Sequence, residues 1–129
     1  MKLQDAYASE SNKIGSWKLI GYVAPGATSA STTGTTTNFV YNAGTNPAIA
    51  AETGVDIAGL EETVVWGASN SVALNDCSAQ TTTTAADANW KIAVKAASNG
   101  NSILYKASTN CTQLTPTFAN MTSTGYTAE

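Results

Sequence analysis

The chain of 129 residues contains no histidine and no arginine, and its six basic residues are all lysines. Without histidine it lacks the commonest general base of enzymes, the Ser-His and Cys-His nucleophile systems and the usual ligand of transition metals. The lysines are outnumbered by nine acidic residues, for a formal net charge of −3, whereas affinity for nucleic-acid phosphates needs clustered cations. We therefore expect no nucleic-acid binding by the isolated domain.

The carboxylates are the remaining candidates for acid–base chemistry. A glycosidase pair needs two carboxyl groups held roughly 5 to 9 Å apart across a cleft. Glu61 and Glu62 are adjacent, and in a strand adjacent side chains point to opposite faces. Calcium-loop, GxGxxG and P-loop motifs do not occur in the sequence. We predict a protein that is not an enzyme and that has no metal or cofactor site.

Charge and long apolar runs are also scarce. Charged residues make up 12% of the chain, about half of what is usual, and small hydroxyl and amide residues dominate. Such surfaces are common in secreted and cell-surface proteins. No apolar run reaches the roughly 18 residues of a membrane span, and the N-terminus lacks the layout of a signal peptide. We expect an exported protein whose natural leading segment is replaced by Met1 and Lys2.

The two cysteines, Cys77 and Cys111, are too far apart for a CxxC redox motif. Without histidine they cannot complete an ordinary zinc site. A disulfide between them is the favoured interpretation, and it would close a loop of about 35 residues, worth roughly 4 kcal/mol in the chain-entropy model. Two buried free thiols are the alternative.

The start of the chain predicts a helix. Leu3 to about Ile14 contains neither Gly nor Pro and places Leu3, Tyr7 and Ile14 along one side, and Gly15 would end it. The β-branched and aromatic residues after Gly15 favour strands, and the long Ser/Thr/Gly stretch between them favours a loop. The predicted segments are a strand at 17–23, a polar loop at 24–38 and a short strand at 38–41.

The middle of the chain predicts a further helix and a hairpin. Asn46 as N-cap, Pro47 at the first helical position and Gly54 at the end predict a helix of about two turns. The apolar runs 63–66 and 71–74, separated by Gly-Ala-Ser-Asn, predict a β-hairpin.

The clearest strand is Trp90 to Lys95. Its large apolar residues are predicted to face the core, and the alternate residues Lys91, Ala93 and Lys95 to face water. It follows a polar loop at 81–89, and an Asn-Gly turn at 99–100 predicts that 102–106 pairs with it. After Cys111 we expect a short irregular segment packed on the sheet. The chain is thus predicted to be a single α+β domain, with a helix remnant at 1–15 packed on a β-rich antiparallel head at 16–129.

The three tryptophans could serve the core or a ligand. Trp90 alternates with apolar residues and is predicted to lie in the core. Trp17 and Trp66 have no such pattern, so packing in the core and exposure as stacking platforms for sugars both stay open.

Taken together, the predicted N-terminal helix, long polar loop, antiparallel sheet and disulfide resemble the soluble domain of a type IV pilin. Leu3, Gln4, Asp5 and Tyr7 are similar to the stretch that follows the apolar half of the family's long N-terminal helix. Cys77 and Cys111 resemble the pair that pins the family's C-terminal loop to the sheet. The Ser/Thr-rich segment from Ala24 would correspond to the variable connection between helix and sheet.

The resemblance implies a structural subunit of a bacterial type IV pilus, serving adhesion, motility or surface attachment. It implies an extracellular filament of identical subunits, which are anchored in the inner membrane before assembly through the segment missing ahead of Leu3, and contact with a host or abiotic surface. Leu3, Tyr7 and Ile14 would lie on the assembly helix. A minor pilin or pseudopilin, and a secreted all-β carbohydrate-binding or adhesin domain that uses Trp17 or Trp66, are the alternatives.

Overall fold

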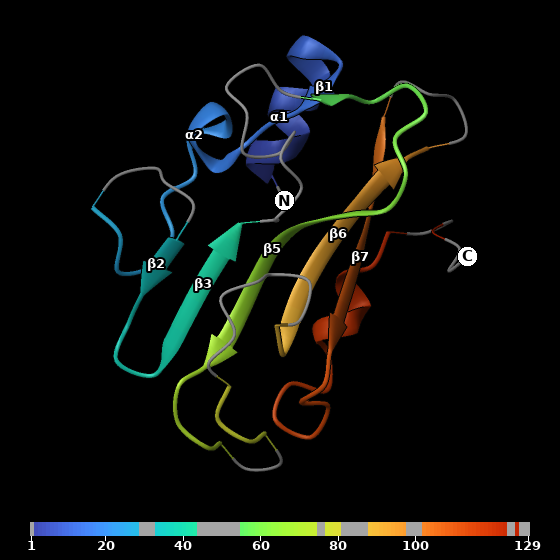
Figure 1. Ribbon diagram of the computed structural model, residues 1–129. Coiled ribbons are helices and arrows are strands. Elements are labelled where there is room, and N and C mark those ends of the chain that lie inside the picture. The colour runs from blue at the N-terminus through green and yellow to red at the C-terminus, as the bar shows by residue number, and fades with distance from the viewer. Residues whose placement is uncertain are drawn as a thin grey trace.

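A five-stranded antiparallel sheet in the order β2-β3-β5-β6-β7 forms the body of the computed structural model (Figure 1). The described residues are 2–28, 33–43, 55–74, 77–80, 88–97, 102–123 and 126. The strands of this sheet are β2 Thr33–Thr35, β3 Phe39–Ala43, β5 Thr63–Asn70, β6 Trp90–Ala96 and β7 Ile103–Thr109. Two helices lie at one end of the sheet, and the predicted α+β class is confirmed.

The N-terminal helix α1 spans Lys2–Ser11 and is shorter than predicted. Asn12 has a φ of 59°, which ends the helix. Ile14 lies instead in the short strand β1 (Lys13–Ile14), which pairs with β4 (Val55–Asp56). Its side chain is 0% exposed in the core, so the prediction that Ile14 lies on an assembly helix is wrong.

The strand predicted at 17–23 is wrong, because Trp17–Ile20 forms the short helix α2. Ser16 caps it, since the hydroxyl of Ser16 accepts a hydrogen bond from the backbone N–H of Leu19. Gly21 ends it with a φ of 77°, a left-handed conformation that glycine adopts without strain. The two caps outweigh the β propensity of the residues between them.

The predicted hairpin at 63–66 and 71–74 is also wrong, because β5 continues through the expected turn to Asn70. The four residues at 67–70 are all buried. All four pair with β3, and Gly67 and Ala68 also pair with β6. Since they are buried, their small side chains suit a strand covered on both faces. The 24–38 segment, predicted as a loop, contains β2, and the helix predicted at 46–54 lies outside the described residues.

The predicted pairing of the C-terminal strands is confirmed, with Trp90 opposite Thr109 and Ala96 opposite Ile103. Trp90 and Val94 are buried as expected. Ala93, predicted to face water, is buried too, at 5% exposure. The expected Asn-Gly turn at 99–100 and most of the 81–89 loop lie outside the described residues.

The free edge of β7 is covered by the segment that follows Cys111. The backbone N–H of Ser123 donates to the carbonyl of Tyr105, and the hydroxyl of Thr122 accepts from the N–H of Ala107. Just before these residues lies the short 3-10 helix η2, Phe118–Met121. The predicted irregular segment packed on the sheet is therefore confirmed, and it blocks pairing of β7 with another chain.

The disulfide predicted between Cys77 and Cys111 is present, with the two Cα atoms 5.5 Å apart. It joins the segment after β5 to the segment after β7. The buried side chain of Asn70 supports the same region, because its amide nitrogen donates to the carbonyls of Val72 and Ser78. A covalent bond and a polar cluster thus fix the end of the sheet opposite the helices (Figure 1).

Replacing both Cys77 and Cys111 by Ser is expected to lower the free energy of unfolding by about 2 to 4 kcal/mol, because the cross-link restricts the unfolded chain. Urea unfolding of the variant and of the oxidised protein measures this difference. Reduction of the unmutated protein is the matched control. Equal midpoints for the oxidised protein and the variant would contradict the prediction.

Substituting Gly21 tests the cap of α2. Gly21→Ala is expected to cost about 1 kcal/mol, since a left-handed φ strains any residue with a Cβ. No heavy atom lies within 4 Å of the added Cβ, so the cost is purely conformational. Gly21→Asn, which tolerates this conformation better, should cost less in the same thermal unfolding measurement, and an Ala variant as stable as the parent would refute the cap.

Candidate functional site

A row of aromatic rings crosses one face of the sheet. Phe39 and Tyr41 come from β3, Trp66 from β5 and Trp90 from β6, while Phe118 comes from η2. Neighbouring ring centroids lie 5.8 Å apart for Phe39 and Trp90 and 6.0 Å apart for Tyr41 and Trp66. Phe118 stacks on Trp66 at 6.3 Å. The strand residues of this row lie together because alternate residues of a strand point to the same face of the sheet.

A register shift between Val64 and Trp66 gives this face an additional side chain. Such a bulge leaves one residue without a partner on the adjacent strand. Here that residue is Val65, which is buried. Val65 and Trp66 consequently line the same cavity although they are adjacent in sequence.

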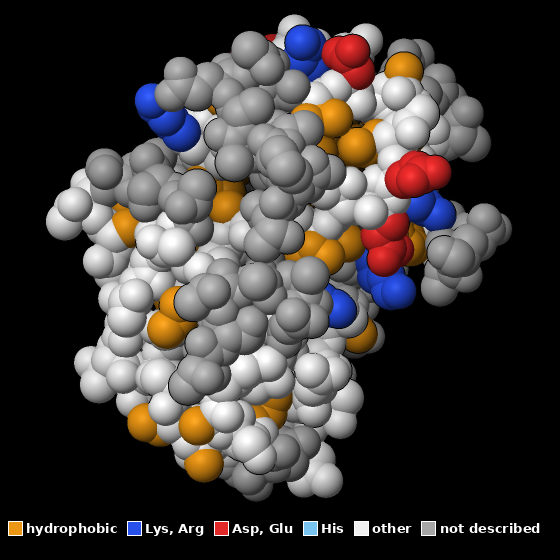
Figure 2. Space-filling model, in the orientation of Figure 1, with side chains coloured by type: hydrophobic (Ala, Val, Ile, Leu, Met, Phe, Trp, Pro, Cys, Tyr) orange, Lys and Arg blue, Asp and Glu red, His pale blue; other side chains and the backbone are white. Residues whose placement is uncertain are grey.

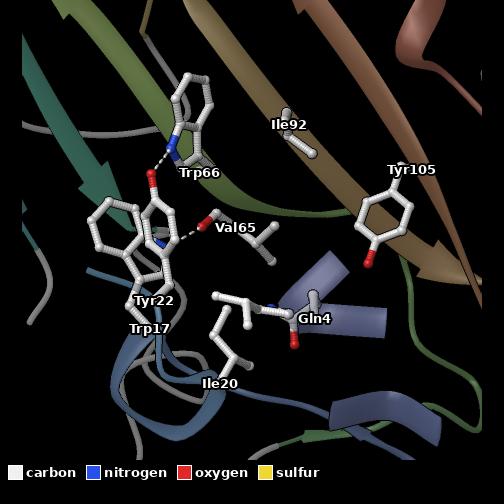
Figure 3. Close-up of a pocket in the computed structure, with 9 residues that line it drawn as sticks. Gln4, Trp17, Ile20, Tyr22, Val65, Trp66, Ile92 and Tyr105 are labelled. Carbon is white, nitrogen blue, oxygen red and sulfur yellow. Dashed lines mark hydrogen bonds between the residues drawn. The ribbon is translucent and has the colours of Figure 1, made fainter. Parts of the chain in front are cut away.

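The cavity lies between the helices and the sheet and has a volume of about 390 Å³. Nine described side chains line it: Leu3, Gln4, Trp17, Ile20, Tyr22, Val65, Trp66, Ile92 and Tyr105 (Figure 3). A second cavity of about 470 Å³ lies toward the disulfide, between the aromatic row and the segment after Cys111. Trp66 lines both cavities, so its indole forms the wall between them. We refer to the first as the helix-side cavity and to the second as the disulfide-side cavity.

The polar groups in the wall of the helix-side cavity bond to the protein itself. The Gln4 amide donates to the carbonyl of Gly15 at 3.0 Å and accepts from its N–H at 2.7 Å. The indole N–H of Trp17 donates to the carbonyl of Val65 at 3.0 Å. The wall therefore presents mainly carbon to the cavity.

Two further hydrogen bonds fix the tyrosines in this wall. The indole N–H of Trp66 donates to the hydroxyl oxygen of Tyr22 at 3.2 Å, drawn as a dashed line in Figure 3. The hydroxyl of Tyr105 donates to Asp5 of α1 at 3.0 Å. Burial, with the nearby Asp5 charge and this hydrogen bond, raises the pKa of Tyr105 well above its usual range. Tyr105 therefore stays protonated and joins α1 to β7.

The structure decides between core packing and surface exposure for Trp17 and Trp66, which the sequence left undecided. Trp17 is 2% exposed, so it is not a surface platform for sugars, although it is among the residues that line the helix-side cavity. Trp66 is half-buried, and it lies between the two cavities. Trp90 is buried as predicted, and its indole N–H donates to Thr115 at 2.7 Å.

Sequence reasoning missed the tyrosines of the site. The sequence predicts a strand at 17–23 for Tyr22, which the structure lacks, and it predicts a strand but no buried face for Tyr105. The alternation of 102–106 could have placed Tyr105 beside its buried neighbours. Of the residues expected on the assembly helix, Leu3 is 43% exposed, and Tyr7 is half-buried beside Gly15.

No charged side chain is among the described residues that line either cavity. Figure 2 shows few charged side chains on one face of the molecule, gathered toward its upper end and one side. Glu61 and Glu62 are exposed, and Glu62 accepts a hydrogen bond from Tyr126. Within the described ranges, no group of three His, Cys, Asp or Glu side chains could hold a metal ion. Helices among these residues are also too short or too polar to cross a bilayer.

The Tyr105–Asp5 contact predicts a steep loss of stability in alkali. Above about pH 10 an unfolded tyrosine releases its proton, whereas the folded chain, with its raised pKa, keeps it. The free energy of unfolding should then fall by up to about 1.4 kcal/mol per pH unit for this group. Burial and the Glu62 contact raise the pKa of Tyr126 too, so it adds to the slope.

Tyr105→Phe should make this slope shallower between about pH 10 and 12, and should cost about 1 kcal/mol at neutral pH by removing one hydrogen bond. Urea unfolding at several pH values measures both quantities, with Tyr41→Phe as a control in the aromatic row. An unchanged alkaline slope would show that the Tyr105 proton is not held by the fold.

The arrangement can enclose an apolar molecule. The described residues bring no nucleophile and base together at either cavity. No family model, curated protein or solved structure matches this chain.

Proposed function

We propose that the chain is the polar head of a structural subunit of a bacterial type IV pilus. The observation that carries the proposal is the attachment of α1. One side of this helix is docked, through Gln4, Ala8 and the Asp5–Tyr105 hydrogen bond. Ala6, Ser9 and Glu10, on its other side, are exposed to solvent.

A filament built on helical stems needs each head to hold its stem in a fixed direction, because every subunit must repeat the same contacts. The α1 helix meets this need. Its first turn bonds to Gly15, and Ala8 packs in the core with Ile14 and Val94. A helical stem continuing ahead of Leu3 would inherit this fixed direction.

The disulfide and the surface support a location outside the cytosol. Disulfides persist in oxidising compartments, and the Cys77–Cys111 bond joins two segments at the end of the sheet away from α1. The sparse charge and the many small hydroxyl and amide residues suit a head that faces water along a filament. The proposal accordingly includes anchoring in the inner membrane before assembly and an extracellular pilus afterwards.

The sugar-binding alternative gains less support. A sugar site needs free polar groups beside an exposed ring face. The indole N–H groups of Trp17 and Trp66 both bond inside the protein, and Trp17 is buried. The filament function therefore fits the geometry better.

Ala6→Glu tests the open side of α1, where Ala6 is exposed. A charge here should abolish filaments, because buried unpaired charges are costly in a stem interface, yet change the stability of the head by less than about 0.5 kcal/mol. Electron microscopy of cells that make and process the full-length protein measures assembly. Ala79→Glu, an exposed position near the disulfide, is the control and should still assemble.

The DNA sequence upstream of the Leu3 codon is a second test of the filament proposal. The proposal requires about 20 apolar residues there, with a prepilin-type processing site. An ordinary cleavable signal or another folded domain in that place would refute it.

A further inference from the structure

We propose that the helix-side cavity binds a small, uncharged molecule that contains an aromatic ring and one hydrogen-bond acceptor. This inference goes beyond the filament proposal and does not depend on it. It rests on the size of the cavity, on the chemistry of its wall and on one hydroxyl proton.

The size of the cavity suits one or two rings. Its volume is about 390 Å³, within the range of roughly 300 to 1,000 Å³ that is typical of ligand pockets. An apolar cavity of about 150 Å³ already binds benzene. Leu3 lines the cavity and is 43% exposed, so the cavity reaches the surface at the first turn of α1.

The wall favours a ring over a sugar or an ion. Trp17, Tyr22, Trp66 and Tyr105 supply aromatic surface, and Ile20, Val65 and Ile92 supply aliphatic surface. Aromatic rings pack well edge to face or offset against such walls. A charged or hydroxyl-rich ligand would lose its hydration without compensation, because the described polar side chains in the wall already bond to the protein.

The hydroxyl of Tyr22 supplies the single polar contact. Its oxygen accepts the hydrogen bond from Trp66, so its own proton remains to be donated. Among the described residues no acceptor takes that proton. Trp17 holds the ring of Tyr22 in an edge contact at 4.8 Å, so the donor has a fixed position. A carbonyl or ether oxygen on the ligand would complete the pair.

The disulfide-side cavity is the internal comparison. It shares Trp66, but its other indole belongs to Trp90, which does not line the helix-side cavity. A ligand in the helix-side cavity should thus affect Trp17 and Trp66 and leave Trp90 unchanged. The three tryptophans of the chain report the location of a ligand directly.

The test is a titration of this chain with acetophenone, a ring with one carbonyl oxygen, followed by NMR of the indole N–H signals. We expect saturable shifts for Trp17 and Trp66 with a dissociation constant below about 1 mM. Glucose, as a second probe, should move neither signal. The proposal is overturned by no saturable shift up to about 10 mM, by shifts of Trp90 alone, or by a response to glucose in place of acetophenone.

Two variants sharpen the test. Ile20→Phe fills the cavity and should weaken acetophenone binding at least about tenfold, whereas Val23→Phe, at a position 48% exposed and outside the lining, should bind as the parent does. An unchanged Trp90 signal shows that each variant is folded. Equal binding by both variants would place the ligand elsewhere and overturn the proposal.

Tyr22→Phe tests the polar contact. It should weaken acetophenone binding about fivefold relative to ethylbenzene, because one hydrogen bond is lost. Ethylbenzene has the same ring without an acceptor. Its change in affinity therefore measures the effect of removing the Tyr22 hydroxyl as acceptor for the Trp66 indole N–H. Equal losses for the two probes would refute the role of the Tyr22 proton.

Discussion

The hydrogen bond from the indole of Trp17 to the carbonyl of Val65, 3.0 Å long, joins the helical layer to the sheet. It depends on the bulge in β5, which leaves Val65 without a partner on β6. It also depends on the caps of α2, which hold Trp17 over that point. From this contact the polar and ring contacts continue through Tyr22 to Trp66. The helix-side cavity exists because these residues hold the two layers apart at a fixed distance.

The two ends of the sheet are stabilised by different means. At the disulfide end a covalent bond and the Asn70 cluster fix the chain. At the helix end the connections are hydrogen bonds from Gln4, Trp17 and Tyr105. Because non-covalent contacts open more readily than a disulfide, local opening of the fold is expected at the helix end before the disulfide end.

Sequence patterns predicted the features that depend on local alternation or on a pair of unique residues. The pairing of β6 with β7, the burial of Trp90 and the disulfide belong to this group. The sequence patterns gave wrong predictions where burial in the folded protein or helix capping decided the conformation. The Gly-Ala-Ser-Asn stretch at 67–70 resembles a turn, yet small residues are also what a strand buried on both faces requires. Trp17 and Ile20 favour strands, yet Ser16 and Gly21 cap a helix around them.

The cavity itself could not be predicted, since its wall combines residues from five separate segments of the chain. The hydrogen bonds of the wall also explain why the cavity does not collapse. An apolar space in a core normally collapses, because side chains gain dispersion contacts by moving inward. Here Trp17, Trp66 and Tyr105 are each held by a hydrogen bond from the polar end of the side chain. Collapse would break those bonds and leave buried donors unpaired, at a cost of about 1 to 3 kcal/mol each. The wall of the cavity is therefore held in one shape, which lowers the entropy that binding would cost.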